Sequence, residues 1–323
     1  MTTAPLVSVV LPVYNEIDHL DEELERIHKA MEASGYPFEI IVVDDASTDG
    51  SAERLRAIRA EQRSRIRLIA FRTNRGAGAA RKIGTEAARG EIVLWTDVDM
   101  SYPNDLLPTL VEALKGFDQV VGARTSEEGS HKMARVPAKW FIRRLAEWLS
   151  NTRIPDLNSG FRAFRKDVAD QFVHLLPDGF SHVTTLTMAF LANGYSVEYI
   201  DIPYTTRSGK SKFRFFADTR LYLQQVTRMV MMWNPLRVLM PIATVLFLVG
   251  FGKIIFDLFD KHFRLGTNTL LIMVTAGMIF VLALLADLVV QVTRPKLTVL
   301  PAAVFEHGID GTDDEPSDPS DTA

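Results

Sequence analysis

The feature that most constrains this chain is a long uncharged stretch near its carboxyl terminus. Residues 265–286 form 22 consecutive uncharged positions rich in Leu, Ile, Val, Met and Phe. A helix of about 20 apolar residues is long enough to cross the hydrocarbon core of a bilayer. A weaker apolar run at 238–252 precedes it, and the short polar connector at 260–264 favours a hairpin over a buried core helix. We therefore predict a two-helix transmembrane anchor over 235–297.

Basic residues beside the two predicted spans indicate their orientation. Arg228 and Arg237 precede the first span, and Arg294 and Lys296 follow the second. Lys and Arg are enriched in the loops on the cytoplasmic side of a membrane. Two spans also return the chain to the side on which it started. We expect a multi-pass protein of the inner (plasma) membrane whose soluble part and tail are cytoplasmic.

The last 23 residues differ in composition from the rest of the chain. Positions 301–323 hold seven acids and no Lys or Arg, so the remaining residues carry a net charge of +3 although the whole chain carries −4. A stretch rich in Asp, Ser, Pro, Gly and Thr cannot bury enough apolar surface to offset the entropy of ordering it. We predict an acidic disordered tail over 298–323. The chain has no cysteine, which excludes a disulfide scaffold and a cysteine-ligated metal centre.

Short apolar runs alternate with helical patterns over the first part of the chain. The runs lie at 7–13, 38–43, 66–71, 92–95 and 119–121. The clearest helical pattern has apolar residues three and four positions apart, at Ile17, Leu20, Leu24, Ile27 and Met31. Alternation of this kind predicts an α/β fold, a mostly parallel sheet with helices on both faces.

Acidic residues follow two of these predicted strands. Asp44 and Asp45 come at the end of one, and Asp97 and Asp99 follow another. Ligands of open parallel sheets bind beyond the carboxyl ends of the strands. Carboxylate oxygens there could hold Mg²⁺ or Mn²⁺ against the phosphates of a substrate. Acids are also common in surface turns, so this pattern alone leaves a structural interpretation open.

Further motifs accompany the acids. They are Pro12-Val-Tyr14-Asn15-Glu16, Asp44-Asp45-Ala-Ser47-Thr-Asp49-Gly50, Asn74-Arg75-Gly76, Asp97-Val-Asp99-Met-Ser101, Pro155-Asp156-Leu157-Asn158-Ser159-Gly160-Phe161-Arg162 and Arg207-Ser-Gly209-Lys210-Ser211-Lys212. Together with the two spans, they resemble family 2 glycosyltransferases of the GT-A fold, and among these the enzymes that load sugars onto dolichyl or undecaprenyl phosphate. The resemblance covers all but the tail, and it implies a GT-A catalytic domain with a Rossmann-like sheet over 1–210.

The resemblance implies roles for individual residues. The nucleotide sugar would be bound by Pro12, Tyr14, Glu16, Asp44, Asp45 and Asp97. Mg²⁺ or Mn²⁺ and the donor diphosphate would be held by Asp97, Asp99 and Ser101, although some relatives have Gln where Ser101 stands. Catalysis would involve Asp97, Asp99 and Asp156. For Asp156, a role as base or positioning group and a role as a structural turn acid both stay open.

The basic segment at 207–212 suits an acceptor that carries a phosphate. Arg207, Lys210 and Lys212 are separated by Gly209 and Ser211, and cationic side chains of this kind can bind a phosphate. A solvated basic loop is the alternative. The resemblance extends the acceptor-phosphate site to Arg124, Ser159, Arg207, Lys210 and Lys212. A phosphate monoester, with a second pKa of about 6, is already nucleophilic at neutral pH and needs no strong base.

Two segments mix apolar and basic residues. We predict amphipathic helices in the lipid headgroup region at about 136–150 and at 211–234. Packing against the catalytic domain would produce a similar apolar stripe, so both interpretations stay open.

The motifs of three other classes of protein are incomplete in this chain. Gly76-Ala-Gly78-Ala-Ala-Arg81 has Arg in place of the third glycine of a dinucleotide fingerprint, and Tyr204 stands where a P-loop would begin with glycine. Gln225-Val-Thr-Arg228 is followed by Met229, whereas polysaccharide synthases that resemble this family have Trp there.

We therefore expect an inverting, metal-dependent enzyme that transfers one hexose from a nucleotide-diphosphate sugar to a polyprenyl phosphate at the membrane. We expect no nucleic-acid partner, and self-association stays open. The alternatives are a glycosyltransferase acting on another lipid or a polysaccharide, and a non-catalytic membrane module that binds a sugar nucleotide.

Overall fold

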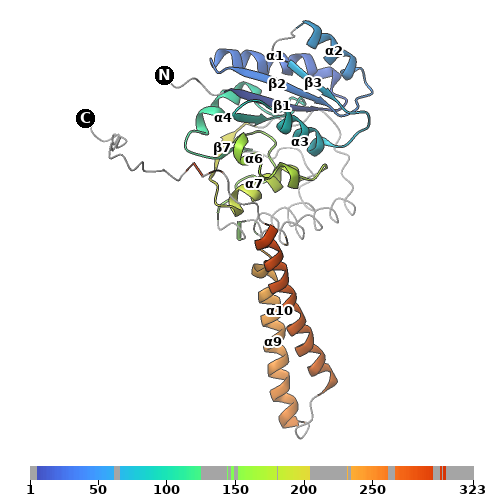
Figure 1. The fold of residues 1–323 in the computed structure, drawn as a ribbon, viewed down its shortest axis with the longest axis vertical. Coiled ribbons are helices and arrows are strands. Elements are labelled where there is room, and N and C mark those ends of the chain that lie inside the picture. Colours follow the sequence, from blue (N-terminus) through green and yellow to red (C-terminus); the bar gives the residue numbers. More distant parts are fainter. Residues whose placement is uncertain are drawn as a thin grey trace, which may run out of the picture.

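A computed structural model describes residues 6–61, 66–124, 152–179, 181–203, 234–260 and 266–293, together with positions 144, 147, 148, 231, 299, 301 and 302. The soluble part is built on a seven-stranded sheet with the order β3-β2-β1-β4-β6-β5-β7 (Figure 1). Its strands are β1 Val7–Val13, β2 Phe38–Asp44, β3 Ile66–Ala70, β4 Ile92–Trp95, β5 Gln119–Arg124, β6 Arg162–Arg165 and β7 Val197–Ile202. All neighbours are parallel except β6, which is antiparallel to β4 and β5. The predicted mostly parallel α/β fold is confirmed.

Helices cover both faces of this sheet. They are α1 Ile17–Ala33, α2 Ser51–Glu61, α3 Ala77–Ala87, α4 Leu107–Ala113, α6 Lys166–Ala169 and α7 His182–Ala192, with short 3₁₀ turns η1 Asn104–Leu106 and η2 Val173–Leu175. Successive side chains of a strand point to opposite faces. Val9 accordingly packs in the core with Leu20 of α1, and Val10 packs in the other core with Leu186 of α7. Both faces of the sheet are therefore buried, which is why its strands are nearly continuous apolar runs.

Small residues bring α3 close to the sheet. A Cβ atom added at Gly84 would lie 2.4 Å from Cγ1 of Val10 on β1, well inside van der Waals contact. A larger residue at this position would push α3 outward. The close packing of α3 matters because this helix carries Arg81, which contacts Asp97 in the candidate active site described below.

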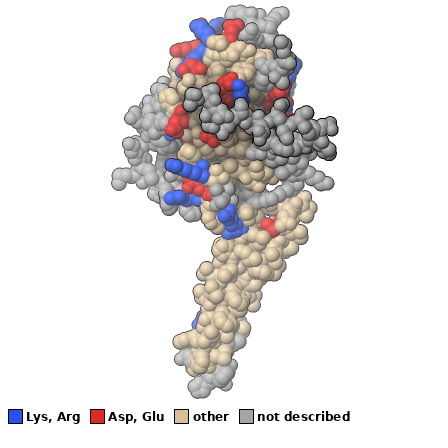
Figure 2. Space-filling model, turned by 90° about the vertical axis from the view of Figure 1, so that its left-hand side faces the viewer, with Lys and Arg blue, Asp and Glu red and all other residues tan. Residues whose placement is uncertain are grey.

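The carboxyl-terminal helices form an antiparallel hairpin that extends away from the sheet (Figure 1). They are α9 Pro235–Asp260 and α10 Thr267–Thr293, and the spans Pro235–Phe259 and Thr267–Val292 are long and apolar enough to cross a membrane. Side chains such as Leu248 and Leu271 are exposed on the hairpin, unlike those of a core helix. Charged side chains gather on the soluble part, as Figure 2 shows. The predicted pair of long apolar helices is confirmed.

Buried polar contacts close the hairpin at its far end. Asp257 on α9 is fully buried, and its Oδ2 atom accepts hydrogen bonds from the backbone N–H of Gly266, at 2.9 Å, and from the hydroxyl of Thr269. Lys253, one turn earlier, lies 3.8 Å from the same carboxylate. The bond from Gly266 satisfies a backbone donor just before the start of α10. These contacts account for Lys253 and Asp257, the two charges that lie inside the apolar part of α9.

The chain beyond α10 contacts the soluble part again. The hydroxyl of Tyr195 donates to the carbonyl of Val299 at 2.8 Å, and the backbone N–H of Ala302 donates to Oδ1 of Asp118 at 3.0 Å. The start of α9 and the end of α10 therefore both lie next to the soluble part, as expected for a hairpin that crosses a membrane twice (Figure 1). Most of the predicted tail lies outside the described residues.

Asp118 is expected to be a major stabilising residue of the soluble part. It is fully buried, it pairs with Arg165 at 3.1 Å, and it accepts bonds from the backbone and hydroxyl of Ser196. Asp118→Ala removes the acceptor of the N–H and hydroxyl of Ser196 and of the N–H of Ala302. Each buried donor left unsatisfied costs about 1–3 kcal/mol, so the substitution should lower the free energy of unfolding by about 3–5 kcal/mol, although Arg165 keeps Asp167 as a partner. Asp167 pairs with the same Arg165 but is half exposed, so Asp167→Ala should cost less than about 1 kcal/mol. Urea unfolding of detergent-solubilised protein measures both, and equal losses would contradict the expectation.

The two predicted interface helices fall almost entirely outside the described residues and stay predictions. One contact is defined at position 148, where the guanidinium of Arg237 lies 4.9 Å from the ring centre of Trp148. It connects the segment predicted at 136–150 with the first turn of α9.

Candidate active site

The predicted site residues arrive at one edge of the sheet although they are distant in sequence. The carboxyl ends of β1, β2 and β4 share this edge because these strands are parallel neighbours. Since β6 runs antiparallel to β4, with Arg162 opposite Trp95, the loop before β6 reaches the same edge. The acids after β2 and β4 and the motif at 155–162 are thereby brought to a common surface, the usual location of ligand sites in such sheets.

The loop after β1 is tied to the loop after β2 by side chains. Oδ1 of Asn15 accepts from the backbone N–H of Thr48 at 2.8 Å, and Oδ2 of Asp49 accepts from that of Ile17 at 3.0 Å. Asn15 has a φ of 57°, a left-handed conformation that Asn tolerates better than most residues. Among the predicted nucleotide ligands here, Tyr14 is exposed, whereas Pro12 and Glu16 are partly buried.

Asp44 and Asp45 are both buried at the end of β2. The carboxylate of Asp45 accepts hydrogen bonds from the backbone N–H groups of Arg75, at 2.6 Å, and Gly76, at 2.8 Å. Gly76 has a φ of 94°, which a residue with a side chain rarely adopts. Oδ1 of Asp44 accepts from the N–H of Ser47 at 3.2 Å. These acids therefore shape the loops that surround the edge, and Asp45 holds the loop that leads into α3.

The turn after β4 presents two carboxylates. Val98, which lies between the two acids Asp97 and Asp99, is buried in the core. Oδ1 of Asp99 accepts from the N–H and the hydroxyl of Ser101, at 3.2 and 2.5 Å. Met100 has a φ of 61°, and strained residues of this kind occur at sites where the surroundings impose one geometry. The turn is thus held in a single shape by its own contacts.

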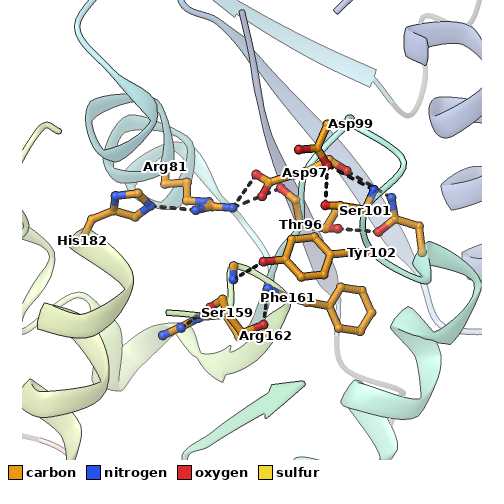
Figure 3. A network of polar contacts seen from close by, with 12 residues as sticks. Arg81, Thr96, Asp97, Asp99, Ser101, Tyr102, Ser159, Phe161, Arg162 and His182 are labelled. Atoms are coloured by element: carbon orange, nitrogen blue, oxygen red, sulfur yellow. Dashed lines mark hydrogen bonds and ion pairs between the residues drawn. The ribbon is translucent and has the colours of Figure 1, made fainter. Parts of the chain in front are cut away.

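A buried arginine contacts the first of these acids. Arg81, on α3, donates from one terminal nitrogen to Oδ1 of Asp97 at 2.6 Å, and its other terminal nitrogen lies 2.7 Å from Nε2 of His182. Figure 3 shows the guanidinium between the imidazole and the carboxylate. The Arg81 side chain is only 4% exposed, against 31% for Asp97. The carboxylate of Asp97 therefore contacts a buried guanidinium while part of its own surface remains exposed to solvent.

His182 is a neutral hydrogen-bond acceptor in this arrangement. Its Nδ1 atom lies 2.9 Å from the carbonyl oxygen of Gly179, which can only accept, so Nδ1 carries the proton. Nε2 is then unprotonated and accepts from Arg81. Burial, and next the charge of Arg81, lowers the pKa of His182 to about 3. The imidazole is therefore uncharged at neutral pH.

The loop before β6 packs directly on the pair formed by Arg81 and Asp97. A Cβ atom added at Gly160 would lie 2.6 Å from Nη2 of Arg81 and 3.2 Å from Oδ2 of Asp97. The N–H of Gly160 donates to the hydroxyl of Tyr102 at 2.8 Å, and the ring of Tyr102 stacks on Phe161. Burial, with the nearby Asp97 charge, raises the pKa of Tyr102 to about 12, so it stays protonated.

Ser159 and Arg162 lie inside the domain. Both are fully buried, and Arg162 donates to the backbone carbonyl of Ser159 at 3.1 Å and to the hydroxyl of Thr187 at 2.9 Å. Burial lowers the pKa of Arg162 to about 10, which still leaves it charged at neutral pH. The hydroxyl of Ser159 accepts from the N–H of Phe161 at 3.3 Å. Ser159 is thus buried within the loop that its motif forms.

Asp156 and Arg124 form a close ion pair at the end of β5. The carboxylate accepts from Nε of Arg124 at 2.6 Å and from its Nη2 at 3.0 Å, and it also accepts from the N–H of Asn158. Burial alone would raise the pKa of Asp156, but the hydrogen bonds and charge of Arg124 hold it below its ordinary value. A carboxylate with a lowered pKa is a weak base. This geometry favours a positioning role for Asp156.

Sequence reasoning missed several members of this network. Asn104 accepts from the hydroxyl of Thr96 and donates to Glu23 and, at 3.2 Å, to the backbone carbonyl of Asp97. Arg81 drew notice only as a departure from a dinucleotide fingerprint, and His182 carried no recognisable spacing. The sequence did offer one signal for Arg81. A charged residue within the apolar pattern of a helix is rarely buried without a partner. The basic candidates Arg207, Lys210 and Lys212 lie outside the described residues.

The carboxylates at this edge fit a divalent cation that is shared with a ligand. No group of three or more His, Cys, Asp or Glu side chains that could hold a metal occurs in the part of the chain that the structure describes. Asp97 and Asp99 supply the hard oxygen atoms that Mg²⁺ and Mn²⁺ prefer, and Mg²⁺ is commonly held by one or two carboxylates together with substrate phosphates. The residues present therefore fit a cation completed by a diphosphate.

Known structures share this fold. Glucosyl-3-phosphoglycerate synthase from Mycobacterium tuberculosis, solved with Mn²⁺ and UDP-glucose, matches with a TM-score of 0.53 and 21% identity, over 70% of this chain and 79% of the synthase chain. The same enzyme in complex with phosphoglyceric acid matches with a TM-score of 0.53 and 19% identity, over 70% and 80% of the two chains. At this level of identity, the likeness shows the GT-A fold.

Curated relatives are more similar in sequence. The undecaprenyl-phosphate 4-deoxy-4-formamido-L-arabinose transferase of Edwardsiella ictaluri is 32% identical over 254 residues, which is 77% of this chain and 75% of that protein. The transferase of the same name from Pectobacterium carotovorum is 32% identical over 251 residues, covering 76% and 73% of the two chains.

Two family models match different parts of the chain. The model described as the GtrB C-terminal hairpin matches residues 234–292, which comprise α9 and nearly all of α10. The model of glycosyl transferase family 2 matches residues 8–172, from β1 through α6, and includes the turn with Asp97 and Asp99. The chain belongs to glycosyl transferase family 2 and is a glycosyltransferase with a GtrB-type membrane hairpin.

Proposed function

We propose that this protein transfers one hexose from a UDP-sugar to a polyprenyl phosphate at the cytoplasmic face of the inner membrane. One observation carries the proposal: a single chain joins the carboxylate turn at 97–99 to a two-helix hairpin that is long and apolar enough to span a bilayer. The names of the curated relatives specify undecaprenyl phosphate, and the solved neighbours bind UDP and UDP-glucose. The basic residues beside the two spans support the cytoplasmic orientation.

In this proposal the donor lies across the carboxyl edge of the sheet. Asp97 and Asp99 would hold Mg²⁺ or Mn²⁺ with the donor diphosphate, and Ser101 orients Asp99 through the hydrogen bonds described above. The cation, when bound, would neutralise the charge that develops on the leaving diphosphate. Pro12, Tyr14, Glu16 and the loops held by Asp44 and Asp45 would surround the nucleoside.

The acceptor reacts as a phosphate. One of its oxygens forms a bond to the anomeric carbon while the bond from that carbon to the diphosphate breaks, so the configuration inverts and the nucleoside diphosphate leaves. A phosphate monoester is largely dianionic at neutral pH, with a second pKa of about 6, and no proton has to be removed. The lowered pKa of Asp156 fits a site without a strong base, in which Asp156 positions Arg124.

Lipid-linked product formation tests the proposal. Membranes that contain the protein are incubated with polyprenyl phosphate and labelled UDP-hexoses, GDP-mannose or UDP-4-deoxy-4-formamido-L-arabinose, and lipid-linked monosaccharide is measured. Transfer from a UDP-hexose is the expected result. Transfer from the arabinose donor alone would refute the hexose, whereas sugar found in a polymer or on diacylglycerol would refute the acceptor. Donor binding by calorimetry without any transfer would indicate a binding module.

The basic segment provides a separate test of the acceptor. Lys210→Ala combined with Lys212→Ala should raise the KM for polyprenyl phosphate by roughly 10-fold, because two charge-assisted contacts to the phosphate are lost. The KM for the donor should change by less than about twofold, since these lysines belong to the acceptor side. Initial rates at varied acceptor and donor concentrations measure both constants. A larger effect on the donor constant would refute the acceptor role.

A further inference from the structure

We propose that His182 is a positioning residue that acts through Arg81 to orient the carboxylate of Asp97. The inference deepens the proposed function, on which it rests. His182 lies outside residues 8–172, which the family model matches, so the match to family 2 does not account for it. The three residues come from the start of α7, the middle of α3 and the turn after β4. They meet only in the folded chain (Figure 3).

The guanidinium of Arg81 is held at both terminal nitrogens. One donates to Asp97 and the other to Nε2 of His182. Its third nitrogen, Nε, is buried and has no hydrogen-bond partner among the described residues. The orientation of the guanidinium plane is therefore set by its two ends and by the ring of Trp95, whose centre lies 5.5 Å away. Loss of the bond to His182 would leave a second buried donor unsatisfied, which is unfavourable.

His182 can serve this function because its ring is itself fixed. Nδ1 donates to the carbonyl of Gly179, so the lone pair of Nε2 points at Arg81. The ring of His182 also packs edge-on against Trp95, with ring centres 5.8 Å apart. A group that supports a ligand through a hydrogen bond commonly controls its orientation, and removing such support typically costs 10- to 100-fold in metal affinity or activity.

The orientation of the Arg81 guanidinium affects the carboxylate of Asp97, which is a candidate ligand of the cation. This carboxylate is the partly exposed end of the chain of contacts, and Asp99 follows two residues later in the same turn. Arg81 compensates one of the two negative charges, which reduces the mutual repulsion of the two carboxylates when they face the same cation. The bond also selects one rotamer of Asp97. Displacement of Arg81 would release the carboxylate of Asp97 from this rotamer and so weaken the binding of a cation together with a diphosphate.

Two substitutions separate the positioning role from a merely structural one. His182→Asn keeps a donor near the position of Nδ1 for the carbonyl of Gly179 but is too short to accept from Arg81. His182→Gln places an amide oxygen near the position of Nε2 and can accept from Arg81. Both variants keep a polar residue at the start of α7. His174, which is exposed in η2, provides the matched control His174→Asn.

The experiment measures binding and turnover separately on the full-length protein in detergent. Mn²⁺ binding in the presence of UDP is followed by electron paramagnetic resonance, sugar transfer by the lipid-product assay, and folding by circular dichroism and the thermal midpoint. His182→Asn should weaken Mn²⁺ binding with UDP, and lower kcat/KM for the donor, by roughly 10- to 100-fold. His182→Gln should retain both within about threefold, and His174→Asn should match the unmodified protein.

Several outcomes would overturn the inference. They are Mn²⁺ binding by His182→Asn that equals that of the unmodified protein, equal impairment of the Asn and Gln variants, and absence of Mn²⁺ binding with UDP by the unmodified protein. The binding measurement needs no acceptor. If the unmodified protein transfers no sugar to polyprenyl phosphate while the Asn and Gln variants still differ in Mn²⁺ binding, the proposed function fails and the positioning role stands.

Discussion

Asp99→Asn is expected to reduce sugar transfer by roughly 10²- to 10³-fold, the loss typical of removing a group that stabilises charge in a transition state. Asparagine has nearly the same size, and its Oδ1 atom can still accept the bonds that Ser101 donates to Asp99. The turn should therefore keep its shape and lose only the negative charge. Lipid-linked product formation measures the loss, while membrane association and circular dichroism should be unchanged.

The control for this variant is an acid of the same type outside the site. Asp170 is exposed directly after the short helix α6 and pairs with Lys166 of that helix at 2.5 Å. An exposed pair of this kind contributes little, so Asp170→Asn should leave transfer within about twofold. Near-normal transfer by Asp99→Asn would refute the assignment of Asp99 to a cation and diphosphate.

Gly160→Ala is expected to lower transfer by roughly 10²-fold, because a displacement of about 1 Å at a reacting centre can have an effect of that size. The added Cβ atom would lie 2.6 Å from Nη2 of Arg81. Either the guanidinium moves away from Asp97 or the loop before β6 moves outward. The lipid-product assay measures the activity, and the thermal midpoint shows whether the domain remains folded.

A glycine outside the site, Gly277, provides the control for Gly160→Ala. A Cβ atom added at Gly277 on α10 would have no heavy atom within 4 Å, and its backbone is helical. Gly277→Ala should therefore keep normal transfer and preserve the helix. Equal activity of the two variants would show that Gly160 has no steric role at the pair formed by Arg81 and Asp97. Reduced activity in Gly160→Ala alone, at an unchanged thermal midpoint, is the expected pattern.

The two acids of the turn after β4 differ in their surroundings. Asp97 is partly exposed and paired with a buried cation, whereas Asp99 is buried and accepts from a neutral serine. The negative charge of the pair is thus partly compensated before any ligand arrives. This difference is why Asp99 is the more informative position for a charge-removing substitution.

Much of the architecture was predictable because it rests on local apolar patterns. The runs at 7–13, 38–43, 66–71, 92–95 and 119–121 correspond to β1 through β5, and the helix marked by Ile17 and Met31 is α1. The two long apolar helices follow from length and hydropathy alone. The short strands β6 and β7 were not among the predicted strands. Arg162–Arg165 has charged residues at both ends, so its four positions show no clear apolar run.

The sequence by itself determined the first five strands of the mostly parallel sheet, the two apolar helices of the hairpin and the acids at the ends of β2 and β4, because each depends on residues close together along the chain. Comparison with known proteins then confirmed the resemblance to family 2 that those motifs indicate. Only the tertiary structure decided which side chains act together. Arg81, Asp97 and His182 are paired across 101 positions of sequence. Burial selects such partners, since a charge removed from water is stable only where packing supplies its counterpart.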